Sequence, residues 1–174
     1  MVSLNGLASS LSFVIIRNQR CNRNPACGIF GEKPLHGKCC EMMEADHDMK
    51  VLVVDDSLVM RRIITNHLQA LGYSDILEAD NGEKALRILE QEPVDLILSD
   101  WCMRVMHGIE VLRSVRKNAA TRNIPFIMVT AEAQPHLILE AIQAQVSDYV
   151  VKPFTRENLR ESIEKVLTLG QMAG

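Results

Sequence analysis

A short apolar run that ends in two adjacent carboxylates constrains the fold of this chain more than any other feature. Residues 50–57 have the sequence KVLVVDDS, in which four consecutive apolar residues precede Asp55 and Asp56. Continuous apolar runs are typical of strands that are buried on both faces of a parallel sheet. Such strands end at the carboxyl edge of the sheet, where open α/β folds bind their ligands. Paired aspartates there indicate either a site for a hard divalent cation or, alternatively, one helix cap beside one solvated carboxylate.

Strand and helix patterns alternate along the rest of the chain. Further strands are predicted at residues 76–79, 94–99, 124–129 and 148–151. Helices are predicted to begin near Ser57, Asn81, Gly108, Pro135 and Thr155. Five strands alternating with five helices predict an α/β fold, in which a doubly wound parallel sheet is covered by helices on both faces.

The spacing of apolar residues predicts which face of each helix is buried. In the first helix this face includes Ile63 and Leu68, and in the fourth it includes Ala141 and Ile142. Trp101 follows Asp100 in the loop after the third strand, and we expect it to pack at the rim of the site.

Four of the five predicted strands end in a reactive polar side chain. These residues are Asp55 with Asp56, Asp100, Thr130 and Lys152. Each has an ordinary explanation when it is considered alone, as a helix cap, a satisfied hydroxyl or a surface charge. Because the topology brings the strand ends to one edge of the sheet, their joint occurrence favours a common site over coincidence.

The chemistry of this set suits phosphoryl transfer to a carboxylate. Asp100 is the predicted nucleophile, which would form an acyl phosphate. A divalent ion such as Mg²⁺, held by Asp55 and Asp56, would offset the repulsion between the two anions. Lys152 and the hydroxyl of Thr130 are placed to contact phosphoryl oxygens.

Composition adds a few limits. The chain has 174 residues, a formal net charge of -3 and a sequence pI of ≈ 6.0, so its overall charge gives no nucleic-acid signal. Its apolar runs are shorter than the ~18 residues that a membrane span needs. We interpret residues 1–48 as a flexible N-terminal extension of unknown role, residues 49–170 as the folded domain and residues 171–174 as a tail.

Four of the five cysteines precede residue 41, and their spacing matches no paired C-x-x-C zinc pattern. Free thiols are the favoured interpretation and a metal knuckle is the alternative. A reducing, cytoplasmic setting fits best.

The residues at the strand ends resemble those of response-regulator receiver domains in two-component signalling, and most nearly those of single-domain chemotaxis regulators. The resemblance rests on Asp55-Asp56-Ser57, Asp100, Thr130-Ala131-Glu132 and the run from Tyr149 to Phe154, and it covers residues 49–169. It implies a flavodoxin-like sheet with strand order 2-1-3-4-5.

The resemblance also implies roles for individual residues. Asp100 would be phosphorylated by a histidine kinase or phosphotransfer protein, and the chain would catalyse its own phosphorylation and dephosphorylation. Mg²⁺ would bind Asp55, Asp56, Asp100 and the backbone carbonyl of Cys102.

Two further features follow from the same resemblance. Tyr149 would be a switch residue whose rotamer follows Thr130, and the Lys152–Pro153 peptide bond would be cis. Downstream proteins would bind the face formed by the fourth helix, the fifth strand and the fifth helix, with no role for nucleic acid or membrane.

The chain departs from the family pattern near Asp100. The family usually has M-P-x-x-[DN]-G after its phosphoacceptor, whereas residues 103–108 here read MRVMHG. Arg104 therefore adds a positive charge beside the site, where it could pair with phosphoryl oxygens or with Glu132. Gln145 stands where the family usually has a small residue, and a left-handed backbone there would cost about 1 kcal/mol.

These departures leave alternatives open. Arg104 and His107 motivate the hypothesis of a receiver-fold adaptor that binds partners without phosphorylation. A phosphatase with an aspartyl intermediate is less favoured, because the loops are short for covering a substrate.

Overall fold

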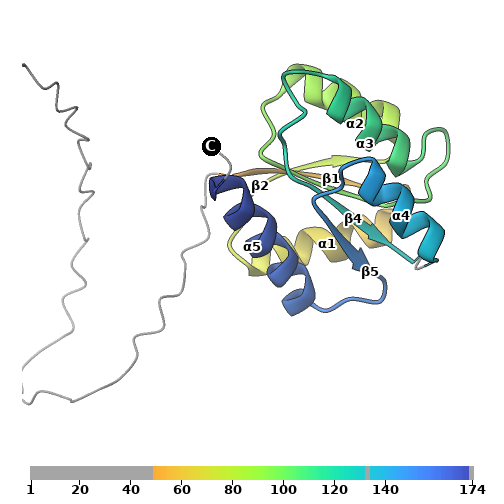
Figure 1. The fold of residues 1–174 in the computed structure, drawn as a ribbon. Coiled ribbons are helices and arrows are strands. Elements are labelled where there is room, and N and C mark those ends of the chain that lie inside the picture. The colour runs from red at the N-terminus through yellow and green to blue at the C-terminus, as the bar shows by residue number, and fades with distance from the viewer. Residues whose placement is uncertain (1–48, 132–133, 173–174) are drawn as a thin grey trace, which may run out of the picture. The chain divides into compact units, whose positions relative to one another are not determined.

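The computed structural model describes residues 49–131 and 134–172, in which five strands alternate with five helices (Figure 1). The strands are β1 (Lys50–Val54), β2 (Asp75–Ala79), β3 (Leu96–Ser99), β4 (Phe126–Thr130) and β5 (Asp148–Val151). The helices are α1 (Leu58–Ala70), α2 (Gly82–Gln91), α3 (Gly108–Lys117), α4 (Pro135–Gln143) and α5 (Arg156–Met172). Helix α5 includes residues 171 and 172, the first two of the predicted tail. The predicted extension at residues 1–48, its cysteines and residues 173–174 lie outside the described residues, so the domain boundaries stay a prediction.

All strand pairs are parallel, and the order in the sheet is β2-β1-β3-β4-β5, which confirms the predicted topology. In the register of the two central pairs, Val54 lies opposite Ser99, and Ser99 lies opposite Met128. The ends of β1 and β3 are therefore side by side. Asp55 and Asp100 directly follow these strands, so they lie next to each other at the carboxyl edge of the sheet.

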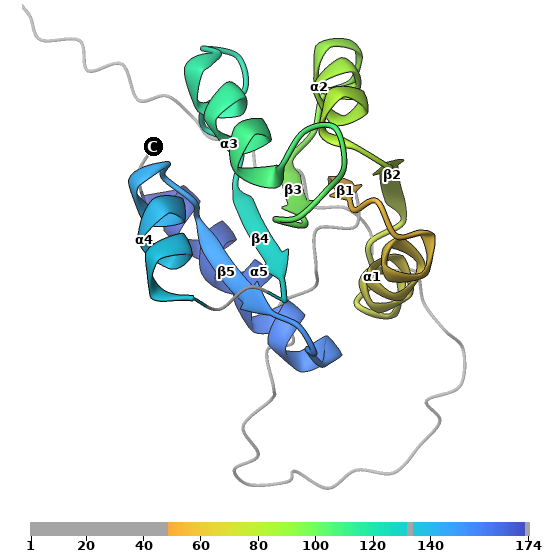
Figure 2. The same ribbon diagram turned by 90° about the vertical axis from the view of Figure 1, so that its right-hand side faces the viewer.

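Helices cover both faces of the sheet, with α2 and α3 on one side and α1 and α5 on the other (Figures 1 and 2). Alternate strand residues supply two separate cores, because successive side chains of a strand point to opposite faces. Leu52 and Val54 pack with α2, α3 and α4, whereas Val51 and Val53 pack with α1 and α5. The sheet is thus buried on both faces, as its continuous apolar strands predict.

Several details of the buried faces differ from the sequence prediction. Ile63 and Ile142 were expected to face inward but are exposed, because Ile64 and Ala141 occupy the buried lines of α1 and α4. One residue corresponds to about 100° around a helix, so a neighbour of a buried residue can face solvent. Trp101 is more deeply placed than a rim residue and joins the core under α2 and α3.

The predicted strands at residues 94–99 and 124–129 begin two residues too early. Pro125 has no backbone N–H to donate to a ladder, and β4 starts after it at Phe126. Before β3, the side chain of Asp95 accepts a hydrogen bond from the Lys50 N–H at 2.8 Å. The Asp95 N–H in turn donates to the Lys50 carbonyl at 2.9 Å, so Asp95 is bonded to β1 although regular β3 begins at Leu96.

The helix starts agree with the caps that the sequence indicates. The Ser57 hydroxyl accepts a hydrogen bond from the Met60 N–H at 3.4 Å, and the Asn81 side chain accepts one from the Lys84 N–H at 2.9 Å. Pro135 occupies the first turn of α4, where its missing N–H costs nothing. These caps fix where each helix leaves the carboxyl edge of the sheet.

The end of α4 is held in a left-handed turn at Gln145, whose φ is 62°. The Val146 N–H donates to the Ala141 carbonyl at 3.0 Å, and the Gln145 N–H donates to the Ile142 carbonyl at 2.9 Å. These two bonds define a Schellman motif with Gln145 at the position that usually carries glycine. The left-handed backbone that the sequence analysis considered for Gln145 is therefore present.

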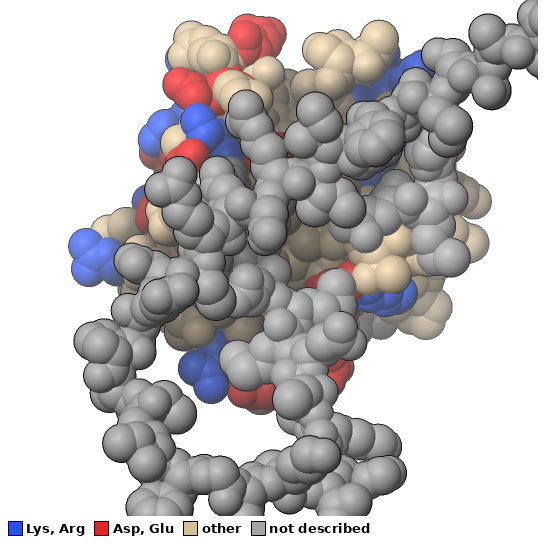
Figure 3. Space-filling view, turned by 90° about the vertical axis from the view of Figure 1, so that its left-hand side faces the viewer, with Lys and Arg blue, Asp and Glu red and all other residues tan. Residues whose placement is uncertain are grey.

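On the side of the molecule shown in Figure 3, the visible basic and acidic side chains are interspersed. No helix among the described residues is long and apolar enough to cross a membrane.

Candidate functional site

Asp55 begins the loop after β1 and is buried. One carboxylate oxygen, Oδ1, accepts a hydrogen bond from the Ser57 N–H at 2.8 Å, and the Asp55 carbonyl accepts one from Arg61 Nη1 at 2.7 Å. The other carboxylate oxygen, Oδ2, lies 2.8 Å from Lys152 Nζ. The turn into α1 therefore leaves one face of this carboxylate directed at the lysine.

Lys152 connects Asp55 to Asp100. Its Nζ donates to Asp55 Oδ2 at 2.8 Å and to Asp100 Oδ1 at 2.9 Å. Asp100 is buried at the end of β3, and its N–H donates to the Val54 carbonyl at 2.8 Å, which ties it to the end of β1. Three side chains from the ends of three strands thus meet around one ammonium, as the parallel topology predicts.

Burial and pairing shift the acid–base behaviour of this cluster. Burial raises the pKa of Asp100 above its usual value, and the nearby charge of Asp55 raises it further, against the opposing effect of the bond with Lys152. Burial lowers the pKa of Lys152, but its bonds with Asp55 and Asp100 outweigh burial, so the pKa is raised overall. The lysine therefore stays protonated, and Asp100 is a more basic carboxylate than an exposed one.

Asp56 faces a different cation from its neighbour. Its Oδ2 accepts a hydrogen bond from Arg104 Nε at 3.2 Å, and its side chain is half-buried. Arg104 lies in the loop between β3 and α3. The sequence suggested pairing of Arg104 with phosphoryl oxygens or Glu132; Glu132 lies outside the described residues, and the pairing with Asp56 was not foreseen.

The remaining predicted residues lie around this cluster. Thr130 is the buried last residue of β4, and its carbonyl accepts a hydrogen bond from the Lys152 N–H at 2.8 Å. Tyr149 lies in β5 opposite Met128 and packs at the edge of the core under α4. Cys102 is exposed in the loop after Asp100. The Lys152–Pro153 bond is cis, which confirms that prediction.

Gly108 allows the loop after Asp100 to close tightly. Its N–H donates to the Trp101 carbonyl at 2.9 Å, and a Cβ at this position would lie 2.0 Å from the Asp100 carbonyl oxygen. A side chain at this position would therefore push α3 away from Asp100. The glycine fixes the distance between Asp100 and the start of α3.

The carboxylates of Asp55, Asp56 and Asp100 are hard oxygen donors of the type that Mg²⁺ prefers. The ability of Asp55 and Asp100 to approach one Lys152 nitrogen within 2.9 Å indicates that both can contact a single cation. Within residues 49–131 and 134–172, however, no three acidic, histidine or cysteine side chains are already gathered as a metal cluster. Each carboxylate instead contacts a basic side chain.

Two arginines make contacts at the site that the sequence did not predict. Arg61 binds the Asp55 carbonyl and, through Nε, Glu78 Oε2 at 3.2 Å, which links α1 to β2. The spacing between Arg61 and Asp55 matches no motif that would have indicated this contact. Arg104 was noticed as a departure from the family pattern, but only the fold shows that Asp56 is within its reach.

Comparison with known proteins agrees with the geometry. Residues 51–164 match the family of response regulator receiver domains. The chain belongs to this family. The receiver domain is 49% identical over 118 residues to the chemotaxis protein CheY of Pseudomonas aeruginosa, which covers 68% of this chain and 95% of that protein. It is 43% identical over 126 residues to CheY-3 of Vibrio cholerae, which covers 71% and 97% respectively.

Solved receiver structures have the same fold. The Vibrio cholerae chemotaxis regulator CheY4 matches with a TM-score of 0.64 and 34% identity, over 68% of this chain and 98% of that one. The receiver domain of a Pseudomonas aeruginosa sensor histidine kinase matches with a TM-score of 0.62 and 31% identity, over 68% and 97%. That structure has a magnesium ion coordinated in its active-site cleft.

Proposed function

We propose that this receiver domain is a phosphoacceptor response regulator of a two-component, chemotaxis-like pathway, phosphorylated on Asp100 by a histidine kinase or phosphotransfer protein. The observation that carries the proposal is the contact of Lys152 with both Asp55 and Asp100. These carboxylates lie 97 and 52 positions from the lysine in the sequence. A buried cluster assembled from such distant segments is costly to maintain for stability alone, which favours a chemical role.

The transfer reaction balances with Asp100 as the nucleophile. One of its carboxylate oxygens forms a bond to phosphorus while the bond between phosphorus and the phosphohistidine nitrogen breaks. The electron pair of that bond stays on the departing imidazole, and the product is an acyl phosphate on Asp100. Burial raises the pKa of Asp100, and a more basic carboxylate is a stronger nucleophile once it is ionised.

Lys152 and Thr130 then stabilise the new phosphoryl group. In the unphosphorylated domain Lys152 holds Asp100 Oδ1 at 2.9 Å, and its flexible stem can follow the negative charge to a phosphoryl oxygen. The Thr130 hydroxyl can donate a hydrogen bond to a second phosphoryl oxygen. We further propose that movement of Thr130 toward Asp100 vacates space for Tyr149, whose altered rotamer carries the signal to the surface.

The residues that would hold Mg²⁺ are Asp55, Asp56, Asp100 and the Cys102 carbonyl. When bound, Mg²⁺ would neutralise carboxylate and phosphoryl charge and align the phosphoryl group with its acceptor. The donor set suits this ion because it consists of hard oxygens and includes three carboxylates. The family resemblance and the magnesium in a related receiver structure support the assignment.

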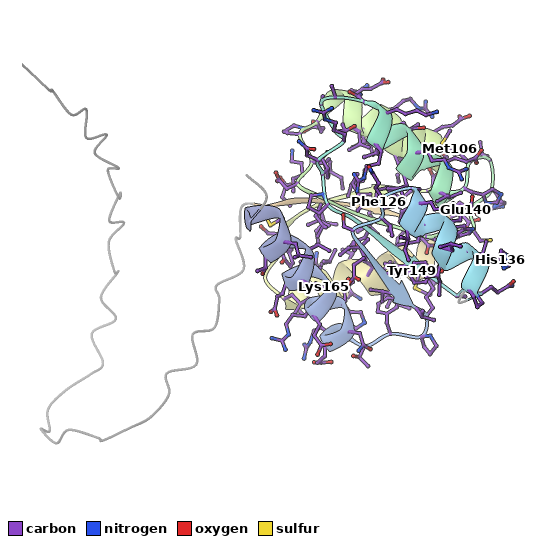
Figure 4. The ribbon with its side chains drawn as sticks, in the orientation of Figure 1. Met106, Phe126, His136, Glu140, Tyr149 and Lys165 are labelled. Carbon is purple, nitrogen blue, oxygen red and sulfur yellow. The ribbon has the colours of Figure 1, made fainter. Side chains whose placement is uncertain are left out.

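The output surface in this proposal consists of α4, β5 and α5. Figure 4 shows labelled side chains from all three elements, namely Glu140 on α4, Tyr149 on β5 and Lys165 on α5. Leu139 and Ile142 are exposed one turn apart on α4, which provides apolar contact area for a protein partner. A groove of about 420 Å³ lies between β5 and α5. We place this switch in the cytoplasm, with protein partners and no binding to nucleic acid or membrane.

Phosphorylation by acetyl phosphate tests the central claim. With Mg²⁺ present, intact-mass measurement should find one acid-labile phosphoryl group on the wild type and none on Asp100→Asn. Asp80→Asn is the matched control, because Asp80 is an exposed carboxylate directly after β2. Equal labelling of the wild type and Asp100→Asn would remove Asp100 from the mechanism.

The output surface has its own measurement. Beryllofluoride, which mimics the phosphoryl group, should change amide hydrogen exchange in α4 and β5 of the wild type in the presence of Mg²⁺. The same addition should leave Asp100→Asn unchanged. Exchange that is identical with and without beryllofluoride in the wild type would contradict the proposed switch.

The contact between Arg104 and Asp56 favours a second candidate, an adaptor that binds partners without being phosphorylated. In that case Asp56 would remain neutralised by Arg104, and Asp100 would not be phosphorylated. Mass measurement separates the two functions, because the adaptor would carry no phosphoryl group under any of these conditions.

A further inference from the structure

Arg104 reaches the acidic site from the solvent side. Its Nε lies 3.2 Å from Asp56 Oδ2, while 84% of the arginine side chain and 26% of the aspartate side chain remain exposed. The contact uses one nitrogen and one oxygen, so it lacks the paired geometry of the strongest arginine–carboxylate bonds. Arg104 is therefore held beside Asp56 in a way that another cation can reverse.

The backbone after Arg104 fixes where its side chain starts. The Met106 N–H donates to the Arg104 carbonyl at 2.9 Å, and Val105 between them has a φ of 75°. A bond across three residues with a positive central φ is the rarer and more strained form of γ-turn. A β-branched residue is unfavourable there, so the surrounding loop must impose this conformation. With this turn directly after it, Arg104 lies within hydrogen-bond distance of Asp56.

The charges of the site are already balanced in large part by the chain itself. Lys152 contacts Asp55 and Asp100, and Arg104 contacts Asp56, so each of the three carboxylates has a basic partner. A divalent ion that binds Asp56 would have to displace a guanidinium and not only water. It would also enter a site whose negative charge Arg104 has reduced.

We propose that Arg104 is an intramolecular competitor of the divalent cation at Asp56 and thereby sets how readily this receiver domain binds Mg²⁺. The inference rests on the proposed function, because it concerns the same metal site. Since the pair is exposed, its removal should strengthen Mg²⁺ binding only roughly two- to fivefold.

Calorimetric titration of the full chain with Mg²⁺ tests the competition. Arg104→Met should bind Mg²⁺ roughly two- to fivefold more tightly than the wild type. Arg122→Met is the matched control, because it removes the same charge from an exposed position before β4, at the opposite edge of the sheet. Arg104→Lys keeps the charge and should stay close to the wild type. Equal affinities of Arg104→Met and Arg122→Met would overturn the inference.

A second readout follows the guanidinium directly. The Nε–H nuclear magnetic resonance signal that disappears in Arg104→Met identifies Arg104 in the wild type. This signal should shift during a Mg²⁺ titration with the midpoint found by calorimetry. A signal that does not move at saturating Mg²⁺ would show that the pair stays intact and that no competition occurs.

The outcomes distinguish this inference from the proposed function. Absence of Mg²⁺ binding in every variant would contradict the metal site itself. Mg²⁺ binding and Asp100 phosphorylation that are indifferent to Arg104 would leave the proposed function in place and reject the competitor.

Discussion

Replacing Gln145 with glycine should stabilise the domain, because this residue ends α4 with a φ of 62°. A left-handed backbone costs a residue with a side chain about 1–2 kcal/mol, a cost that glycine does not have. Glycine also has more conformational freedom in the unfolded chain, which lowers the free energy of unfolding by about 0.4–1 kcal/mol. We therefore expect Gln145→Gly to raise the free energy of unfolding by about 0.5–1 kcal/mol.

The contacts of Gln145 support a clean measurement. Its side chain is exposed, and its carbonyl accepts a hydrogen bond from Arg116 Nε at 2.9 Å that glycine would retain. Burial lowers the pKa of Arg116, whose guanidinium also binds the carbonyls of Arg122 and Ile124. The substitution thus changes the backbone preference without removing the hydrogen bonds that anchor the end of α4.

Urea unfolding followed by circular dichroism is the assay, with two controls. Gln143→Gly alters the exposed last residue of α4 and should lower the free energy of unfolding by about 0.5–1 kcal/mol. Gln145→Ala removes the side chain but keeps the backbone cost, so it should change stability by less than about 0.5 kcal/mol. If Gln145→Gly is no more stable than the wild type, strain at this position does not limit stability.

Three further predictions concern the site. Gly108→Ala places a Cβ where the Asp100 carbonyl oxygen lies 2.0 Å away, and urea unfolding should show a loss of at least about 2 kcal/mol. Lys152→Met leaves two buried carboxylates facing each other and should cost about 3 kcal/mol, part of which Mg²⁺ should restore; an unchanged midpoint would contradict this. Because burial raises the pKa of Asp100 above 3.8, this side chain contributes stability in its protonated form that is lost as pH rises through the folded pKa. An asparagine side chain cannot titrate, so Asp100→Asn lacks this loss. The urea midpoint of Asp100→Asn relative to that of the wild type should therefore rise between about pH 4 and neutral pH, and a difference that is constant with pH would refute the assignment.

Sequence alone predicts the fold and the meeting of the main acidic and basic residues, because both depend on backbone topology. Once five apolar runs are assigned to parallel strands, the residue after each run must lie at one edge of the sheet. Asp55, Asp100 and Lys152 meet for this reason. The prediction succeeds where periodicity and topology are sufficient.

The sequence prediction fails where the result depends on which of two neighbouring helix residues is buried, or on the direction of a single side chain. Ile63 and Ile142 lie next to buried positions, so an apolar pattern cannot tell which of two neighbours faces the sheet. Arg104 contacts Asp56 beside a γ-turn at Val105, and no local sequence motif indicates either feature. Such features arise from tertiary packing of the loop and therefore appear only in the folded structure.

The loop between Asp100 and Gly108 separates two physical properties of the site. Gly108 has no space for a side chain, so changes there must alter the packing that places Asp100. The Arg104 side chain is 84% exposed, and Val105 as a whole residue is 77% exposed. Substitutions at these two positions should therefore alter charge and local strain with little effect on the core. The affinity for a cation and the stability of the fold should therefore vary independently along this loop. Substitutions at Arg104 should therefore change how strongly the acidic site is neutralised while β3 and β5 keep Asp100 and Lys152 in contact.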